Sequence, residues 1–281
     1  MNNFSEFRSG DSLSSSIPTL NSSYVSFDLS RLQVHYQPVV CYNTGTVSSL
    51  EALIRYNHPS KGLLYPDSFI DQLQSEISSM GLFKWVLDKT LEHQAYFNLC
   101  KINVPISVNT SPDVFLDLSF IPLIKDYISK SSNPLIIELT ESTKISSVTT
   151  LTHTIDSLKD IHVEVYLDDF GSGFSNHDLI ECLPISTVKI DKSLIFRMLD
   201  TSEDADLIKS IIALLRKRNI QVVAEGVNSI FEADFLHYCG CYLIQGYGIR
   251  KSINHFSIPL WFHKSTLEND WWTRKLDFKF E

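Results

Sequence analysis

Two adjacent carboxylates, Asp168 and Asp169, stand at the end of a short apolar run in this 281-residue chain. The run, residues 163–167, has the β-branched and apolar composition of a strand, and a glycine-rich segment, residues 170–173, follows the acids directly. Burying an unpaired carboxylate costs several kcal/mol. At the mouth of a parallel sheet or barrel, such a pair suits a divalent cation. A solvated acidic turn is the alternative, and these residues alone leave both interpretations open.

Polar side chains also occur in, or directly after, the other strands that the sequence predicts beyond the first. They are Glu51 and Arg55, Asn109, Glu138 and Glu141, Lys189 and Asp191, Glu225, and Gln245. In α/β barrels the active site lies at the C-terminal ends of the strands. A shared position at seven strand ends is hard to explain by solvation, so these residues predict one common site.

The candidate ligands offer oxygen atoms only. They are Glu51, Asn109, Glu138, Asp168 and Asp169. Because no His or Cys is interleaved with them, Mg²⁺ or Mn²⁺ is favoured over zinc. Adjacent carboxylates can hold two cations about 3.5–4 Å apart, an arrangement that suits in-line hydrolysis of a phosphodiester by a shared, activated water.

Two basic residues complete this hypothesis. Lys189 would place a point charge near the attacking water, and Arg55 would hold a non-reacting phosphate. The chain carries a formal net charge of −9. This charge argues against binding long nucleic acid, but the cations and these two side chains would reverse it locally for a small anion.

The elements that must position these residues alternate regularly. Two strands, 32–40 and 47–56, are joined by a turn too short for a crossover, so we expect an antiparallel hairpin. Six further strands follow, each but the last preceding a helix; they are predicted at 106–108, 135–139, 163–167, 187–190, 221–224 and 242–246. Helices are predicted near 82–99, 113–128, 148–158, 175–182, 205–219 and 230–238. Eight strands in this order predict an α/β fold with a closed barrel.

Three segments are expected along the chain. Residues 1–30 are rich in Ser and Asn and are interpreted as a mobile tail, 31–253 as the barrel domain, and 254–281 as an aromatic-rich segment that packs on the barrel. An alternative for the last segment is a surface for a protein partner. No apolar run approaches the ~20 residues of a membrane helix, no secretory signal is recognised, and the five cysteines are scattered, so a cytoplasmic protein with no membrane association is expected.

The chain resembles the EAL-domain phosphodiesterases, which hydrolyse the bacterial second messenger cyclic di-GMP. The resemblance rests on Glu51-Ala52-Leu53 together with further blocks in the same order, from about residue 32 to 251. These blocks are Gln37-Pro38, Asn109-Thr110-Ser111-Pro112, Glu138-Leu139-Thr140-Glu141, Asp168-Asp169-Phe170-Gly171-Ser172-Gly173, Lys189-Ile190-Asp191, Ala224-Glu225-Gly226-Val227 and Gln245-Gly246-Tyr247.

The resemblance implies a role for each matching residue. Glu51, Lys189, Glu225 and Asp168 would be catalytic, and Glu225 would be a ligand to a metal or its water or a general base. The metal ligands would be Glu51, Asn109, Glu138, Asp168, Asp169 and Glu225. Substrate contacts would come from Gln37, Leu53, Arg55, Asp191 and Gln245, and Glu141 would anchor the loop 168–175.

The same resemblance implies a modified TIM-like (β/α)8 barrel whose first strand is antiparallel. It also implies two Mg²⁺ or Mn²⁺ ions, inhibition by Ca²⁺, linear pGpG as product, and a homodimer. Departures from the family pattern, such as Ser172, Phe174 and Asn228, remove no expected metal ligand.

Two other functions stay open at this stage. A catalytically silent regulator would bind cyclic di-GMP or a protein partner without cleaving anything. Hydrolysis of a different cyclic dinucleotide, or of pGpG, is the second alternative, because the sequence does not locate the residues that recognise the bases.

Overall fold

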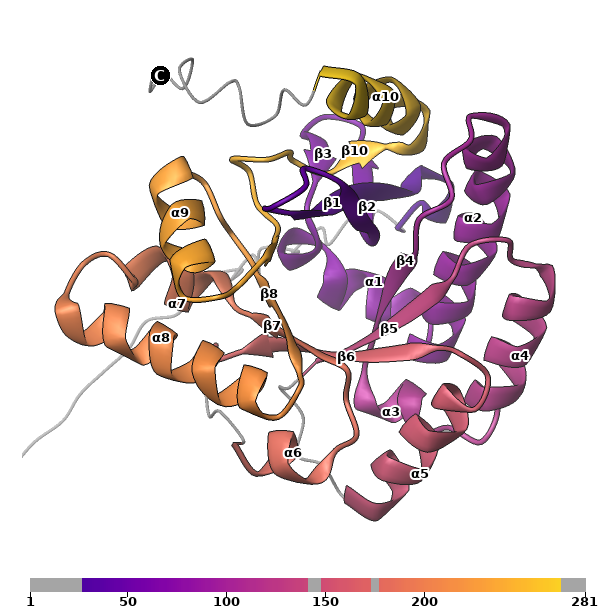
Figure 1. The fold of residues 1–281 in the computed structure, drawn as a ribbon. Coiled ribbons are helices and arrows are strands. Elements are labelled where there is room, and N and C mark those ends of the chain that lie inside the picture. The colour runs from indigo at the N-terminus through magenta and orange to yellow at the C-terminus, as the bar shows by residue number, and fades with distance from the viewer. Residues whose placement is uncertain (1–26, 141–147, 173–176, 269–281) are drawn as a thin grey trace, which may run out of the picture.

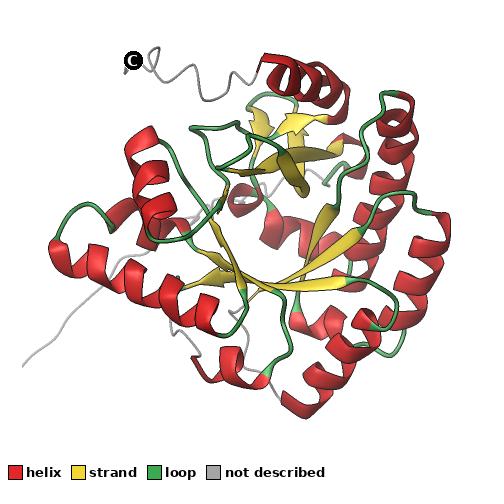
Figure 2. Cartoon of the chain, in the orientation of Figure 1, coloured by secondary structure: helices red, strands yellow, loops and turns green. Residues whose placement is uncertain are grey.

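Eight strands close into a barrel in the computed structural model, which describes residues 27–140, 148–172 and 177–268. Figures 1 and 2 show the helices arranged around these strands. The ring follows the order β1-β9-β8-β7-β6-β5-β4-β2 and is closed by pairing of β1 with β2. The strands are β1 (Leu32–Cys41), β2 (Val47–His58), β4 (Ile106–Thr110), β5 (Leu135–Thr140), β6 (Glu164–Phe170), β7 (Thr187–Ile190), β8 (Gln221–Ala224) and β9 (Leu243–Ile244).

The first strand runs against both of its neighbours, as predicted. β1 is antiparallel to β2, with Gln37 opposite Glu51, and antiparallel to β9, whereas the pairs from β2 through β9 are parallel. Two short strands, β3 (Gly62–Leu64) and β10 (Ile253–Asn254), extend the sheet beside β2 and β1. The expected modified TIM-like barrel is therefore confirmed.

The helices lie outside the ring. They are α1 (Ile70–Glu76), α2 (Ser79–Leu99), α3 (Pro112–Phe115), α4 (Phe120–Lys130), α5 (Val148–Lys159), α6 (His177–Cys182), α7 (Lys192–Arg197), α8 (Ser202–Lys217), α9 (Ile230–Tyr238) and α10 (Ile258–Glu268). Single 3₁₀ turns occupy Leu29–Arg31, Pro66–Ser68 and His255–Ser257. The longer helices bury an apolar stripe; in α8 it consists of Ile208, Ile211, Ile212 and Leu215.

Local hydrogen bonds explain where the helices depart from prediction. The expected helix 113–128 is two helices, because the Asp117 carboxylate accepts hydrogen bonds from the backbone N–H and hydroxyl of Ser119 and forms a turn between them. Helix α7 was not predicted, since its six residues are too few to show a helical period. It begins after Asp191, whose side chain accepts from the Ser193 N–H.

Both ends of the described chain pack on the barrel. Phe27, which the sequence placed in a mobile tail, is buried and stacks on Tyr56, with ring centroids 4.2 Å apart. At the other end Ile258 is buried, and Trp261 and Phe262 pack against the main core. Phe256 is 68% exposed, and the other aromatic residues of the predicted C-terminal segment, Trp271, Trp272, Phe278 and Phe280, lie outside the described residues.

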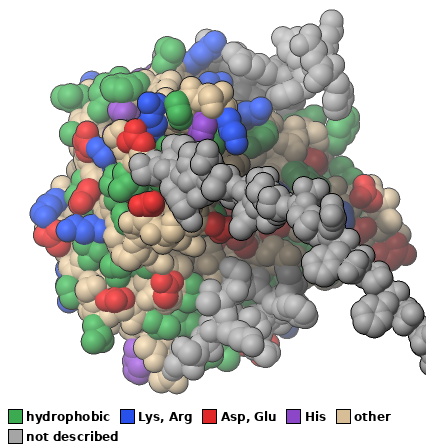
Figure 3. Space-filling model, turned by 180° about the vertical axis from the view of Figure 1, so that it is seen from behind, with side chains coloured by type: hydrophobic (Ala, Val, Ile, Leu, Met, Phe, Trp, Pro, Cys, Tyr) green, Lys and Arg blue, Asp and Glu red, His purple; other side chains and the backbone are tan. Residues whose placement is uncertain are grey.

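The face of the molecule turned away from the viewer in Figure 1 is mixed in character. Acidic, basic and apolar side chains are interspersed on the face seen in Figure 3. Among the described residues no helix is both long and apolar enough to cross a bilayer.

Candidate metal centre

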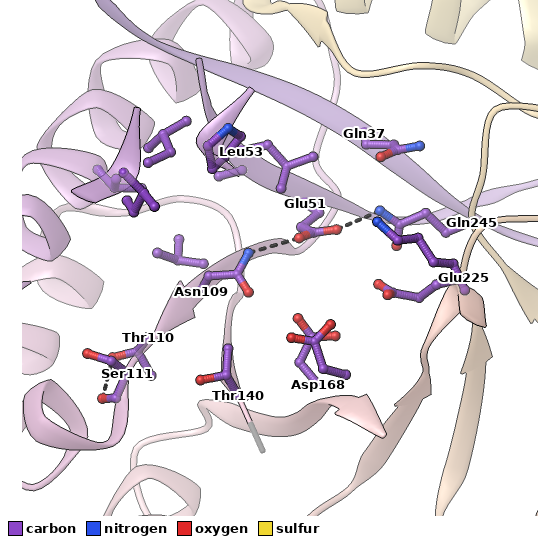
Figure 4. A pocket seen from close by; sticks show the side chains of 18 of the residues that line it. Gln37, Glu51, Leu53, Asn109, Thr110, Ser111, Thr140, Asp168, Glu225 and Gln245 are labelled. Atoms are coloured by element: carbon purple, nitrogen blue, oxygen red, sulfur yellow. Dashed lines mark hydrogen bonds between the residues drawn. The ribbon is translucent and has the colours of Figure 1, made fainter. Parts of the chain in front are cut away.

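Carboxylates from the ends of four strands, β2, β5, β6 and β8, meet inside the mouth of the barrel. Two groups have oxygen atoms within 4.8 Å of one another: Glu51, Glu138 and Asp168 form one, and Asp168, Asp169 and Glu225 form the other. Figure 4 shows Glu51, Asp168 and Glu225 pointing into the same space. Each group could hold a cation, and because Asp168 belongs to both, the two groups adjoin and share one carboxylate.

Lys189 lies at the centre of this cluster. Its Nζ atom is 2.6 Å from Glu225 Oε1, 2.9 Å from Glu138 Oε2, 3.2 Å from Asp168 Oδ1 and 3.3 Å from Glu51 Oε2. The Lys189 side chain is 1% exposed. A fully buried ammonium is stable only with such partners, and here it faces more carboxylates than one charge can balance.

Two amide side chains orient Glu51 (Figure 4). Asn109 Nδ2 donates to Glu51 Oε1 at 2.8 Å, and Gln245 Nε2 donates to Glu51 Oε2 at 2.5 Å. Gln245 Oε1 is a buried acceptor that receives no hydrogen bond from the described residues, and Asp168 Oδ1 is a buried acceptor whose contact is the ion pair with Lys189. A buried acceptor left without a hydrogen bond indicates room for a further ligand, such as a cation or its water.

Burial and mutual repulsion govern the acid–base behaviour of the cluster. Burial raises the pKa of Asp168 and Glu138, although Lys189 opposes both shifts, and it raises the pKa of Glu225 to about 8. Burial also opposes the ionisation of Glu51, but Lys189 and the two amide donors outweigh it and hold its pKa below the usual value. The site as a whole has a deficit of positive charge.

Asp169 extends the cluster from an unusual backbone position. The sequence predicted that the strand ends at residue 167, but β6 continues to Phe170, which pairs with Ile190 after a register irregularity. Asp169 has a φ of +58°, a conformation that aspartate adopts more readily than most residues. Burial, followed by the Asp168 charge, raises its pKa to about 6.

Close packing of two loops fixes Glu225 and Gln245 relative to each other. The Val227 N–H donates to the Gln245 carbonyl at 2.9 Å, and the Gln245 N–H donates to the Ala224 carbonyl at 2.9 Å. A Cβ atom on Gly246 would overlap the backbone of Val227. Glycine is therefore required at 246 for the loops after β8 and β9 to approach.

A cleft of about 750 Å³ opens from the carboxylates. Of the predicted substrate contacts, Gln37, Leu53 and Gln245 line it. Arg55 is buried beside it, with its guanidinium donating to the Ile54 carbonyl and the Ser252 hydroxyl and lying over the ring of Tyr65.

Asp191 and Glu141 are placed differently by the structure. Asp191 is buried as the cap of α7, and neither it nor Arg55 is among the residues that line the cleft, so their contact with a substrate stays a prediction. Glu141, predicted to anchor the loop after β6, lies outside the described residues, as does part of that loop.

Several residues that line the cleft were not anticipated from the sequence. They are apolar or aromatic and come from helices rather than strand ends: Ile70 from α1, Leu82, Phe83 and Val86 from α2, and Phe196 from α7. Their spacing gives only the ordinary signal of a helix packed on a core, so the sequence pattern does not distinguish them.

The family is shown by comparison with known proteins. The family model for the EAL domain matches residues 21–252, and the chain belongs to this family. Over 221 residues it is 31% identical to the bifunctional diguanylate cyclase/cyclic di-GMP phosphodiesterase MucR of Pseudomonas aeruginosa, covering 77% of this chain and 32% of MucR. Over 219 residues it is 32% identical to the cyclic di-GMP phosphodiesterase PdeL of Escherichia coli, covering 75% of this chain and 59% of PdeL.

The fold is shared with solved members of the family. The structure of the PaMucR phosphodiesterase in complex with c-di-GMP superposes with a TM-score of 0.75 at 29% identity, covering 83% of this chain and 96% of that one. The chain spans about a third of the length of MucR. The likeness therefore concerns the EAL domain and not the whole of such relatives.

Proposed function

We propose that this chain hydrolyses cyclic di-GMP to linear pGpG with the help of two divalent cations. The observation that carries the proposal is the pair of carboxylate groups sharing Asp168 at the base of a cleft. A shared carboxylate between two adjoining sites is the arrangement that a two-metal hydrolase requires. The substrate is inferred from relatives that are named as cyclic di-GMP phosphodiesterases.

The charge balance of the cluster supports two cations rather than one. The cluster contains five carboxylates and one ammonium: Glu51, Glu138, Asp168 and Glu225 contact Lys189, and Asp169 adjoins Asp168 and Glu225. If all ionise, four negative charges remain, and two divalent cations would cancel them. The ligands are oxygen atoms only, which favours Mg²⁺ or Mn²⁺.

The two ions, when bound, would activate a water and stabilise the charge that develops on the phosphate. The protein's own residues prepare that site. Asn109 and Gln245 hold Glu51 in one orientation through hydrogen bonds to both of its oxygens. Lys189 places a fixed positive charge beside Asp168 and Glu225, where an attacking water and the reacting phosphate would meet.

The reaction adds one water across one phosphodiester bond of the ring. The bond from phosphorus to the 3′ oxygen breaks, leaving a 5′-phosphate and a 3′-hydroxyl in a linear dinucleotide. Glu225, within 2.6 Å of Lys189 and at the edge of the cluster, is the carboxylate we assign to accept the water's proton.

Incubation with cyclic di-GMP and Mn²⁺, followed by chromatography, tests this function. We expect pGpG to accumulate, EDTA to abolish the reaction and Ca²⁺ to inhibit it. Glu51→Gln should lower turnover by a factor of 10² or more, roughly the loss seen when a stabilising group is removed from an active site.

Glu92→Gln is a matched control, since Glu92 pairs with Lys89 on an exposed face of α2 and does not line the cleft. Undiminished hydrolysis by Glu51→Gln would contradict the mechanism. Binding of cyclic di-GMP without any turnover, with every metal tried, would contradict the activity.

A further inference from the structure

Arg55 is a buried cation whose hydrogen-bond partners among the described residues are neutral. The residue is 4% exposed. Its Nη1 atom donates to the Ile54 carbonyl and its Nη2 atom to the Ser252 hydroxyl, each at 2.7 Å. Its Nε atom is buried without a partner, and no carboxylate of the described residues forms an ion pair with the guanidinium. A buried guanidinium with such partners attracts an anion.

Strand geometry places Arg55 on the face of β2 that carries the metal centre. Alternate residues of a strand point to the same face, so Glu51, Leu53 and Arg55 share one face of β2. Glu51 belongs to the carboxylate cluster, and Leu53 lines the cleft. A ligand that extends from the cluster along this face would therefore bring an anionic group toward the guanidinium.

The hydrogen bond between Arg55 and Ser252 spans a whole strand. β2 pairs with one edge of β1 along almost its full length, so β10 pairs with the other edge. His35 of β1 is opposite Leu53 of β2 and also opposite Asn254 of β10. Because Ser252 directly precedes β10, the Arg55 side chain crosses β1 to reach the Ser252 hydroxyl.

The backbone on both sides of Ser252 is fixed without Arg55. Before Ser252, the Arg250 N–H donates to the Gly246 carbonyl at 3.0 Å, and the Gln37 side chain donates to the Arg250 carbonyl at 3.0 Å. After Ser252, β10 pairs with β1. The Ser252 hydroxyl is thus held in place by its own segment, and we expect its removal to leave this backbone unchanged.

Three contacts together define the position of the guanidinium. Arg55 Cζ lies 4.5 Å from the centroid of the Tyr65 ring, and this contact covers one face of the guanidinium without fixing its rotation. The bonds to the Ile54 carbonyl and the Ser252 hydroxyl restrain that rotation. Of these two acceptors, only the hydroxyl belongs to a side chain, so a substitution at 252 can remove it selectively.

We propose that Ser252 is a positioning residue for substrate binding, whose hydroxyl fixes the Arg55 guanidinium where it meets the non-reacting phosphate of cyclic di-GMP. This rests on the proposed function, which supplies the substrate and places its other phosphate at the cluster. A charged group that is held in one orientation before binding loses less freedom when the ligand arrives. Ser252 therefore acts on affinity and not on the bond-breaking step.

Kinetics of Ser252 variants of the full chain test this role with Mn²⁺. Ser252→Ala should raise the KM for cyclic di-GMP about tenfold and leave kcat within about twofold, because a group that binds the ground state and the transition state equally is lost. Ser252→Thr keeps the hydroxyl and should retain the wild-type KM. Ser257→Ala is the matched control, since the Ser257 hydroxyl donates to the Asn254 side chain in the same part of the chain. An unchanged or lowered KM in Ser252→Ala would overturn the inference.

A double-mutant cycle separates positioning from a general structural effect. In an Arg55→Ala background, Ser252→Ala should raise the KM no further, because the group that the hydroxyl positions is already gone. The same tenfold increase in both backgrounds would show that Ser252 acts independently of Arg55 and would contradict the assignment.

Calorimetry with Ca²⁺ in place of Mn²⁺ measures cyclic di-GMP binding without relying on turnover. The affinity should fall about tenfold in Ser252→Ala and stay at the wild-type value in Ser252→Thr. If the wild-type protein binds but does not hydrolyse with any metal, the proposed function fails, and the comparison of affinities still decides the role of Ser252. If Ser252→Ala binds as tightly as wild type, that role is wrong while the proposed function stands. A wild-type protein that does not bind cyclic di-GMP would overturn both.

Discussion

A single buried ammonium is the residue-scale feature on which the site depends. Lys189 contacts four carboxylates and is almost fully buried, so it stands where an added cation would also be attracted. Burial disfavours its charge, but the carboxylates outweigh burial and hold its pKa well above the usual value. The side chain therefore stays charged and keeps the cluster together in the absence of bound ions.

Lys189→Met tests this role in the metal-free protein. Removing the charge leaves buried carboxylates without a partner, which costs about 3–5 kcal/mol before protonation relieves it. We expect a lower melting temperature in EDTA, partial recovery with Mn²⁺, and loss of turnover. Lys209→Met removes an exposed pair with Asp206 on α8, and it should leave the melting temperature in EDTA and the turnover unchanged. A variant as stable as wild type in EDTA would show that the ammonium does not hold the cluster.

At the scale of secondary-structure elements, the site depends on the close approach of the loops that follow β8 and β9. Glu225 follows β8 and Gln245 follows β9, and backbone hydrogen bonds join the two segments. The two loops can approach this closely only because Gly246 has no side chain. The geometry of the centre is thus set by loop packing as well as by strand register.

Gly246→Ala should lower turnover through that packing. The new methyl group would overlap the Val227 backbone, which cannot rotate away, so Glu225 and Gln245 would move apart. We expect kcat to fall by roughly 10²-fold, as for other small displacements of catalytic groups, with a modest loss of stability.

Gly81→Ala is the control for this substitution. Its Cβ would meet side-chain atoms of Ile77 and Ser78, which can rotate, and alanine has a higher helix propensity than glycine. This variant should be active and at least as stable as wild type. If Gly246→Ala is as active as wild type, the contact between the two loops does not position Glu225 and Gln245.

The architecture of the barrel was predictable from the sequence, whereas the walls of the cleft were not. The alternation of strands and helices and the short turn before residue 47 predicted the closed ring and its antiparallel first strand. Glu51, Glu138 and Asp168 meet because strand ends of a barrel meet, so their convergence followed from the fold alone.

Other features depend on distances that no local pattern contains. Helix α7 is too short to show a period, and the end of β6 depends on the pairing of Phe170 with Ile190. Phe83 and Val114 line the cleft because α2 packs beside β4 while α3 packs beside α2 and β5, and their spacing is that of ordinary core residues. Side-chain chemistry at strand ends is readable from a sequence, but the shape of a cavity between helices is not.

A pair of stacked histidines makes the stability of the whole molecule depend on pH. His93 of α2 stacks on His255 near the C-terminal helix at 3.7 Å between ring centroids, and its Nδ1 atom is 2.9 Å from the Tyr36 hydroxyl of β1. Burial, followed by the charge of His255, lowers the pKa of His93 to about 4. The folded protein therefore holds His93 neutral.

The sign of the pH effect follows from this lowered pKa. The unfolded chain takes up a proton near pH 6.5 and the folded chain only near pH 4, so the stability from neutral His93 is complete above pH 6.5 and is lost as the pH falls toward 4. His93→Asn keeps an acceptor for Tyr36 but cannot titrate. We expect the melting temperature of wild type to fall more steeply than that of His93→Asn between pH 6.5 and 4.5; parallel curves would contradict the assignment.

The central claim is that two cations share Asp168, and anomalous scattering from crystals grown with Mn²⁺ measures this directly. The account predicts two manganese peaks about 3.5–4 Å apart, with Asp168 touching both. Glu51 and Glu138 should flank one peak, and Asp169 and Glu225 the other. A single peak, or two peaks that do not share Asp168, would contradict the account.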